Sequence, residues 1–136
     1  MQESNLMTRR DWTWIALALS ACRNSPMPDL LPETVAGVWR RVAVREMAPS
    51  ESPDPVPRTA VRRLETAQYE GPGKLEARVY ELSSSAVALD VAQRWHPSAD
   101  TVIINQGQFL LVVKWQEADR QALRRFMEEM ENRLAK

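Results

Sequence analysis

The sequence predicts an α+β domain in which an antiparallel sheet of about four to five strands carries two main helices, at about 83–95 and 117–135. A Gly-Pro-Gly reversal at 71–73 and a Gln-Gly pair at 106–107 each separate two strand-like stretches, which predicts two β-hairpins. A segment with apolar residues at helical spacing follows each hairpin. The expected order is therefore β-β-α-β-β-α after a leading strand.

The leading strand comes before a proline-rich loop. Val38, Val42 and Val44 fit a period of two, which predicts that they share one face of a strand. Four prolines lie at about 48–57, where they exclude a helix or a central strand and predict a surface loop. Before this strand, residues 30–36 predict a short helical turn or an irregular segment.

The hairpin strands and the helices have clear internal patterns. In the first hairpin, Leu75, Ala77 and Val79 alternate with polar residues, which predicts one dry face and one mixed face. Serine hydroxyls at 83–85 can cap the first helix, which ends before Pro97. The apolar stripe of the last helix consists of Leu123, Phe126, Met127, Met130 and Leu134.

The first 22 residues have the layout of a secretory signal. The basic pair Arg9-Arg10 precedes an apolar stretch from Trp12 to Cys22. A membrane-spanning helix needs about 20 apolar residues, so this stretch is too short to span a bilayer. The pattern predicts a signal peptide at 1–21. An ordinary cleaved signal without lipid and a buried helix are the alternatives.

The stretch Leu19-Ser20-Ala21-Cys22 resembles the lipobox of bacterial lipoproteins. In that family the cysteine sulfur receives diacylglycerol with acyl chains such as palmitate, and a peptidase cuts before it. The resemblance implies that Cys22 is the lipidation site, that 22–30 holds the anchor and a tether, and that 31–136 is a single domain. It also implies a location in the cell envelope, on the periplasmic or outer-surface side of an inner or outer membrane.

The export route and the start of the chain stay open. Residues 8–12, Thr-Arg-Arg-Asp-Trp, are similar to the twin-arginine export motif, although Thr13 departs from it where an apolar residue is preferred. Paired arginines also occur in general secretory signals. Met7 would give a shorter charged region than Met1.

Three stretches carry a second resemblance: AQYEGPGKLEARVYEL, SSSAVALDVAQRW and GQFLLVVKW. They look like bacterial envelope domains of the β-β-α-β-β-α kind, which are similar in layout to PsbP-like domains. The likeness covers about 58–135. Its motifs are structural, so it implies a fold and no catalytic residue.

Composition limits the chemistry. The chain has 18 Lys and Arg against 18 Asp and Glu, so the basic excess typical of nucleic-acid binding is missing and no such partner is expected. With one cysteine and one histidine, His96, we expect no cofactor and no metal site. Neither G-x-S-x-G, a P-loop nor HExxH is present, so an enzymatic role is not the leading expectation. Glu128, Glu129 and Glu131 lie among arginines and predict an ion-paired, solvated face.

Two side-chain groups are candidate contacts. An arginine-rich stretch at 40–63 would attract an anionic bilayer or cell-wall polymer, with scattered solvated arginines as the alternative. Its members are Arg40, Arg41, Arg45, Arg58, Arg62 and Arg63. Tyr69 and Tyr80 are expected in the core, or as a binding platform if they share an exposed sheet face.

The leading expectation for function is a lipid-anchored bacterial envelope protein with a non-enzymatic domain that binds another envelope protein or a cell-wall polymer. One alternative is a membrane-proximal hydrolase or transferase centred on His96, for which a neighbouring carboxylate or hydroxyl is needed. The other is a small-ligand carrier, which needs an apolar cavity between the helices and the sheet.

Overall fold

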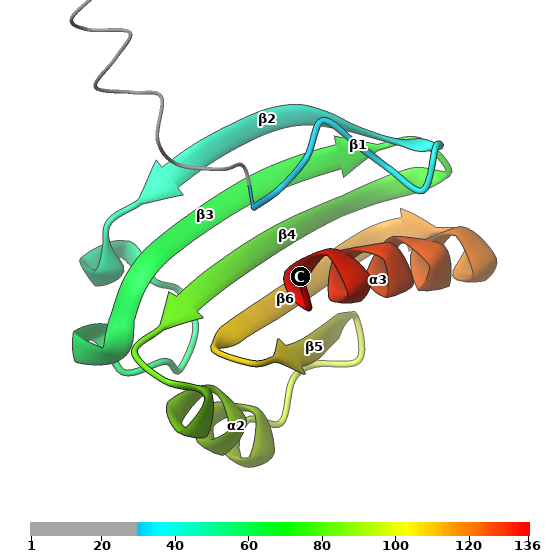
Figure 1. Ribbon diagram of the computed structural model, residues 1–136. Helices are drawn as coiled ribbons and strands as arrows, with labels where there is room; N and C mark the ends of the chain where they lie inside the picture. The colour runs from blue at the N-terminus through cyan, green and yellow to red at the C-terminus, as the bar shows by residue number, and fades with distance from the viewer. Residues whose placement is uncertain (1–29) are drawn as a thin grey trace, which may run out of the picture.

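The computed structural model describes residues 30–136, so the predicted signal peptide, Cys22 and nearly all of the tether lie outside it. The described chain forms a curled six-stranded antiparallel sheet with two α-helices (Figure 1). The predicted α+β class is confirmed. The strand count exceeds the prediction because a two-residue strand forms at 34–35, where we expected a turn or an irregular segment. No helix among these residues has the length and apolar character to cross a bilayer.

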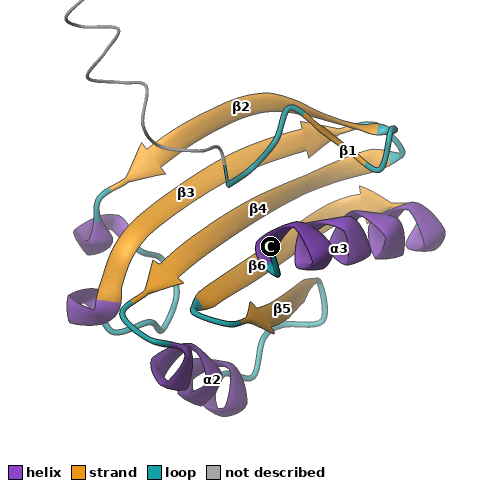
Figure 2. Ribbon diagram, viewed as in Figure 1, coloured by secondary structure: helices purple, strands orange, loops and turns teal. Residues whose placement is uncertain are grey.

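The sheet has the order β1-β2-β3-β4-β6-β5, and each neighbouring pair is antiparallel. The strands are β1 (Thr34–Val35), β2 (Trp39–Met47), β3 (Val61–Glu70), β4 (Gly73–Leu82), β5 (Thr101–Gln106) and β6 (Phe109–Ala118). Helix α2 (Ser85–Arg94) follows β4, and α3 (Arg120–Leu134) follows β6. Short 3-10 turns, η1 (Pro49–Glu51) and η2 (Arg58–Ala60), lie between β2 and β3 (Figure 2). The predicted β-β-α-β-β-α order is confirmed.

Both α-helices begin at a capping side chain. The backbone N–H of Val87 donates to Ser84 Oγ at 3.2 Å, and that of Ala122 donates to the Asp119 carboxylate at 3.0 Å. Helix α3 begins at Arg120 rather than at 117 because β6 runs on to Ala118.

The two faces of the sheet carry separate cores, as alternation of side chains along each strand requires. Leu75, Ala77 and Val79 of β4 belong to the cluster under α3, and we name this side the α3 face. Tyr80 and Leu82 belong to the cluster under α2, on the α2 face. The predicted dry face of β4 is therefore the α3 face.

An aromatic group holds α3 against the sheet. The Phe126 ring meets Trp39 and Tyr69 edge to face, with ring centroids 5.9 Å and 5.0 Å apart. Trp39 Nε1 donates to the Ala122 carbonyl at 2.9 Å, and the Tyr69 hydroxyl donates to the Pro32 carbonyl at 2.6 Å. Buried on the predicted stripe are Leu123, Phe126, Met130 and Leu134.

The period-two prediction fails on β2. Pairing passes from Arg41 opposite Tyr69 to Ala43 opposite Gln68, so Val42 is an extra residue in a bulge and the alternation resets there. The valines predicted to share one face are all exposed, at 50% for Val38, 51% for Val42 and 44% for Val44. Trp39 takes the buried place instead.

Gly73 is required by a close approach between strands. A Cβ atom added at Gly73 would lie 1.8 Å from the carbonyl oxygen of Glu117, well inside van der Waals contact. This position is next to a register shift between β4 and β6. The glycine that the sequence assigns to a turn therefore also lets two backbones meet.

Candidate functional site

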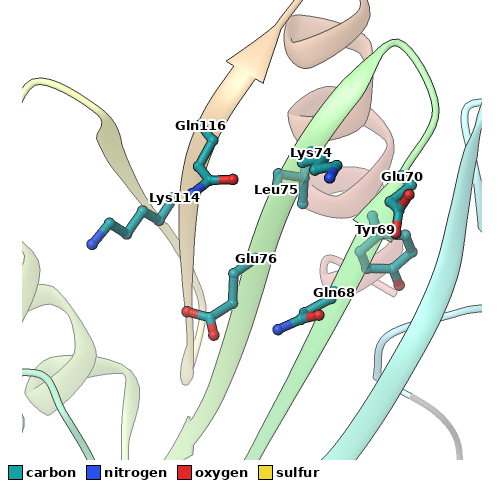
Figure 3. Close-up of a pocket in the computed structure, with 8 residues that line it drawn as sticks. All are labelled: Gln68, Tyr69, Glu70, Lys74, Leu75, Glu76, Lys114 and Gln116. Atoms are coloured by element: carbon teal, nitrogen blue, oxygen red, sulfur yellow. The ribbon is translucent and has the colours of Figure 1, made fainter.

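A cleft of about 430 Å³ opens on the sheet near the β3–β4 turn (Figure 3). It lies on the α2 face, beyond the apolar cluster that packs under α2. Backbone or side-chain atoms of eight residues line it: Gln68, Tyr69, Glu70, Lys74, Leu75, Glu76, Lys114 and Gln116. Tyr69 and Leu75 direct their side chains to the core under α3, so polar side chains supply the functional groups.

The strand register sets these polar groups side by side. Glu76 of β4 lies between Gln68 of β3 and Lys114 of β6 in one cross-strand row. Glu70 and Lys74 are directly paired in the next row.

The sixth polar group, Gln116, follows Lys114 by two residues on β6. Side chains two residues apart on a strand share a face, so Gln116 lines the cleft together with Lys114 (Figure 3). Leu75 pairs with Trp115 and Lys74 with Glu117, which makes Gln116 the extra residue of a bulge between these pairs.

The charges of the cleft balance and are partly uncommitted. Two carboxylates and two ammonium groups line it, with two side-chain amides between them. Within residues 30–136, Glu70, Lys74 and Lys114 form no salt bridge. Their hydrogen-bonding capacity is therefore open to a ligand that carries donors, acceptors and both signs of charge.

A buried polar cluster borders the cleft and fixes the proline-rich loop. The Arg78 guanidinium donates through Nε to Asp54 Oδ2 at 2.8 Å and through Nη2 to Asp54 Oδ1 at 3.0 Å, a bidentate pair. The Tyr80 hydroxyl donates to Asp54 Oδ2 at 2.6 Å and lies 2.8 Å from Ser52 Oγ. Arg78 Nη1 also donates to Glu76, which connects this cluster to the cleft.

The loop is thus more buried than its composition predicts. The Asp54 side chain is 6% exposed, and Val56 packs into the core under α2. We name Ser52, Asp54, Arg78 and Tyr80 the loop clamp.

The loop clamp holds structure in place. Burial, followed by the hydrogen bond to Asp54, raises the pKa of Tyr80 above its ordinary value near 10. The phenol therefore stays protonated near neutral pH and acts as a donor, not as a base. All three guanidinium nitrogens of Arg78 donate to carboxylates, as expected for a structural ion pair.

His96 lines a second cleft of about 330 Å³ between α2 and the proline-rich loop. Pro55, Pro57 and Trp95 are among its walls. His96 itself is exposed, and it forms no hydrogen bond or ion pair with any other residue of the described chain. Asp90 lines the same cleft, but its carboxylate is paired with Arg94. Within residues 30–136, no carboxylate or hydroxyl is hydrogen-bonded to the imidazole, as a hydrolase or transferase centred on His96 would need.

The predicted arginines lie on several elements, some paired with carboxylates and others exposed. Three of its members have carboxylate partners: Arg41 with Glu33 at 3.9 Å, Arg45 with Glu51 at 3.2 Å, and Arg63 with Glu65. Arg40, Arg58 and Arg62 are exposed on β2, η2 and β3. A contact between the arginines and an anionic partner stays a prediction.

The prediction of a tyrosine platform is wrong, because Tyr69 and Tyr80 are both fully buried and belong to opposite faces of the sheet.

Of the predicted acidic group, Glu129 has a specific structural role. Its Oε2 accepts from the backbone N–H of Ala36 at 2.7 Å, in the β1–β2 turn. Among residues 30–136, no group of three or more His, Cys, Asp or Glu side chains is arranged to hold a metal ion.

One pattern in the sequence indicated the cleft. Lys74 and Glu76, which line it, are among the polar residues that alternate with the dry face of β4.

Comparisons with known protein families, with curated proteins and with solved structures find no match to this chain. The resemblance to PsbP-like layouts therefore stays a prediction, and the fold and cleft define an α+β domain with a partly open sheet face.

Proposed function

We propose that this chain is a lipid-anchored bacterial envelope protein whose domain binds a partner protein at the membrane surface through the polar cleft. The cleft itself carries the proposal. It leaves Lys74, Lys114 and Glu70 without salt bridges inside the described chain, next to two side-chain amides, on the surface of central strands.

The charge pattern favours a protein partner over a uniformly charged polymer. A polyanion attracted to Lys74 and Lys114 would also meet the carboxylates of Glu70 and Glu76. A polypeptide offers backbone donors and acceptors together with side chains of both signs, which complements the mixed lining. The partner is therefore expected to present a polar, mixed-charge segment to the cleft.

The anchor rests on the lipobox resemblance at Cys22, with the tether that follows it. Eight extended residues from 23 to 30 span at most about 25–30 Å, which would confine the domain to the membrane surface. Confinement raises the effective concentration of any partner in the same membrane, so weak contacts suffice.

Charge reversal in the cleft tests the binding proposal. In the full chain, Lys74→Glu with Lys114→Glu replaces both ammonium groups by carboxylates. We expect the envelope protein that co-purifies with the chain, recovered without an amine-reactive cross-linker, to fall at least tenfold. Arg124→Glu with Arg125→Glu, on the exposed side of α3, is the matched control and keeps the yield. Equal yields from both pairs would remove the cleft as the binding site.

The anchor is tested separately by intact mass and fractionation. Membrane-extracted protein should lack residues 1–21 and carry acyl chains on Cys22. The Cys22→Ala chain should leave the membrane fraction, and its retention there in unchanged amount would end the anchor proposal while leaving the cleft proposal standing.

A further inference from the structure

Strand β2 is exposed on both faces along part of its length. Every residue from Val42 to Glu46 is exposed, although these residues lie inside β2. The covering strand β1 pairs only with Trp39 and Arg40. Figure 1 shows β2 at the outer edge of the sheet, with its second half beyond β1. No described strand pairs with the outer backbone edge of Ala43–Met47.

An open strand edge is a template for another strand, because its backbone donors and acceptors have no partner. Proteins commonly protect such edges with charges or proline. Here the exposed stretch ends in two charged residues, Arg45 and Glu46, but its first part carries two β-branched valines, Val42 and Val44. We propose that this edge binds β2 of a second copy of the chain in antiparallel orientation, which joins the two sheets into one.

Avoidance of like charges selects the register. For a two-fold axis perpendicular to the joined sheet, an axis through Arg45 or through Glu46 would set two like charges directly opposite each other, which is destabilising. An axis through Ala43 would set the second strand against the bulge at Val42. An axis through Val44 sets Val44 against Val44 and Arg45 against Ala43, so it buries the exposed valine without opposing like charges.

The start of the described chain agrees with this pairing, and this step rests on the proposed anchor. A two-fold axis perpendicular to the joined sheet keeps the α3 faces of both copies on the same side. Leu31, next to the start of the described chain, is buried in the core of the α3 face. The described chains of both copies therefore begin on one side of the joined sheet, as anchors in one membrane require, and both clefts lie on the other side.

The pairing is short, because the bulge at Val42 limits the regular edge to Ala43–Met47. An axis through Val44 pairs only Ala43, Val44 and Arg45 of this edge with one another, and so short a strand pair is weak between free molecules. Anchoring in one membrane supplies the effective concentration that makes it populated.

Cysteine cross-linking of the full chain in the membranes of expressing bacteria tests the pairing. Paired Cβ atoms across an antiparallel ladder lie about 4.5–5.5 Å apart, close to disulfide distance. Val44→Cys should therefore give a disulfide-linked dimer under mild oxidation, at least fivefold above Arg124→Cys. Glu46→Cys is the register control, because its two copies would lie about 13 Å apart along the strands. The wild-type chain, with Cys22 alone, gives the background.

A dimer yield from Val44→Cys no higher than from Arg124→Cys or Glu46→Cys would overturn the pairing, as would a Val44→Cys disulfide to a different protein. Unchanged thermal melting shows that each variant is folded. A Val44→Cys dimer in a chain without lipid would support the pairing and overturn the anchor. Lipid on Cys22 without the dimer would support the anchor and overturn the pairing.

Discussion

The α3 face and the α2 face of the sheet are built from the same strands but have different contents. On the α3 face, β4 contributes Leu75, Ala77 and Val79, and α3 covers them with aromatic contacts around Phe126. On the α2 face, the alternate residues run from Leu82 and Tyr80 to charged side chains that no helix covers. Along β4, the α3 face is buried from Leu75 to Val79, whereas the α2 face is closed at one end and open at the other.

This difference separates stability from binding on one sheet. Because side chains alternate, a central strand can bury one set of residues and present the other. The loop clamp forms the border on the α2 face: Asp54 ties the proline-rich loop over Arg78 and Tyr80, and the cleft begins at Glu76. Substitutions on the α3 face should therefore unfold the domain, and substitutions in the cleft should spare the fold.

The largest effect is expected at Phe126. Phe126→Asp places a carboxylate in the fully buried contact with Trp39 and Tyr69. Burying an unpaired charge costs several kcal/mol, a large part of the roughly 5–15 kcal/mol free energy of unfolding of an ordinary domain. We expect loss of the cooperative thermal transition in circular dichroism.

Leu89→Asp is the control for Phe126→Asp, because Leu89 is 48% exposed on α2. It should change the free energy of unfolding by no more than about 0.5 kcal/mol. A Phe126→Asp protein that melts like the wild type would show that α3 does not hold the domain together.

The second effect is expected at the loop clamp. Asp54→Ala leaves the Arg78 guanidinium, 11% exposed, without its bidentate partner. Removing one member of a buried ion pair costs about 3 kcal/mol. We therefore expect urea denaturation to show a loss of this size in the free energy of unfolding. Glu51→Ala breaks the exposed pair with Arg45 in the same region and should cost less than about 1 kcal/mol. Equal losses would mean that the clamp does not fix the loop.

The clamp also predicts a loss of stability in alkaline solution. Below pH 10, Tyr80 is protonated in both the folded and the unfolded chain, so it adds no pH dependence. Above pH 10 the unfolded chain releases this proton while the raised pKa keeps it on the folded chain. The free energy of unfolding should then fall by about 1.4 kcal/mol per pH unit from this group. Tyr80→Phe should remove that slope, and an unchanged slope would contradict the assignment.

The smallest effect is a gain in stability at the β1–β2 turn. Ala36 has φ of 54° and is followed by Gly37 with φ of 73°, so both central residues of the turn are in the region that favours glycine. Ala36→Gly should raise the free energy of unfolding by about 0.5–1 kcal/mol, because it removes a left-handed alanine. A decrease would show that the turn carries no strain.

Periodicity in the sequence was sufficient for the order of elements, because the hairpin reversals and the α3 stripe are local patterns. The exceptions depend on single residues. The extra residue Val42 shifts the β2 pattern, and nothing in its type marks a bulge. The bond from Asp54 to Arg78 joins positions 24 residues apart, so no local pattern indicates it.

The cleft was hidden for a related reason. The polar residues of β4 were visible as an alternation, but their exposure depends on how far α2 and the proline-rich loop extend over the sheet. Lys114 and Gln116 join them because β6 pairs with β4 beside the cleft. Both conditions are set by tertiary contacts.

Site-specific photo-cross-linking tests the central claim, that the open part of the α2 face is the binding surface. A photoreactive residue replaces Gln68, in the wall of the cleft, or Arg124, on the exposed side of α3, in the full chain in living bacteria. We predict that Gln68 captures an envelope protein and that Arg124 does not. Capture of the same protein at both positions, or at Arg124 alone, would contradict the account.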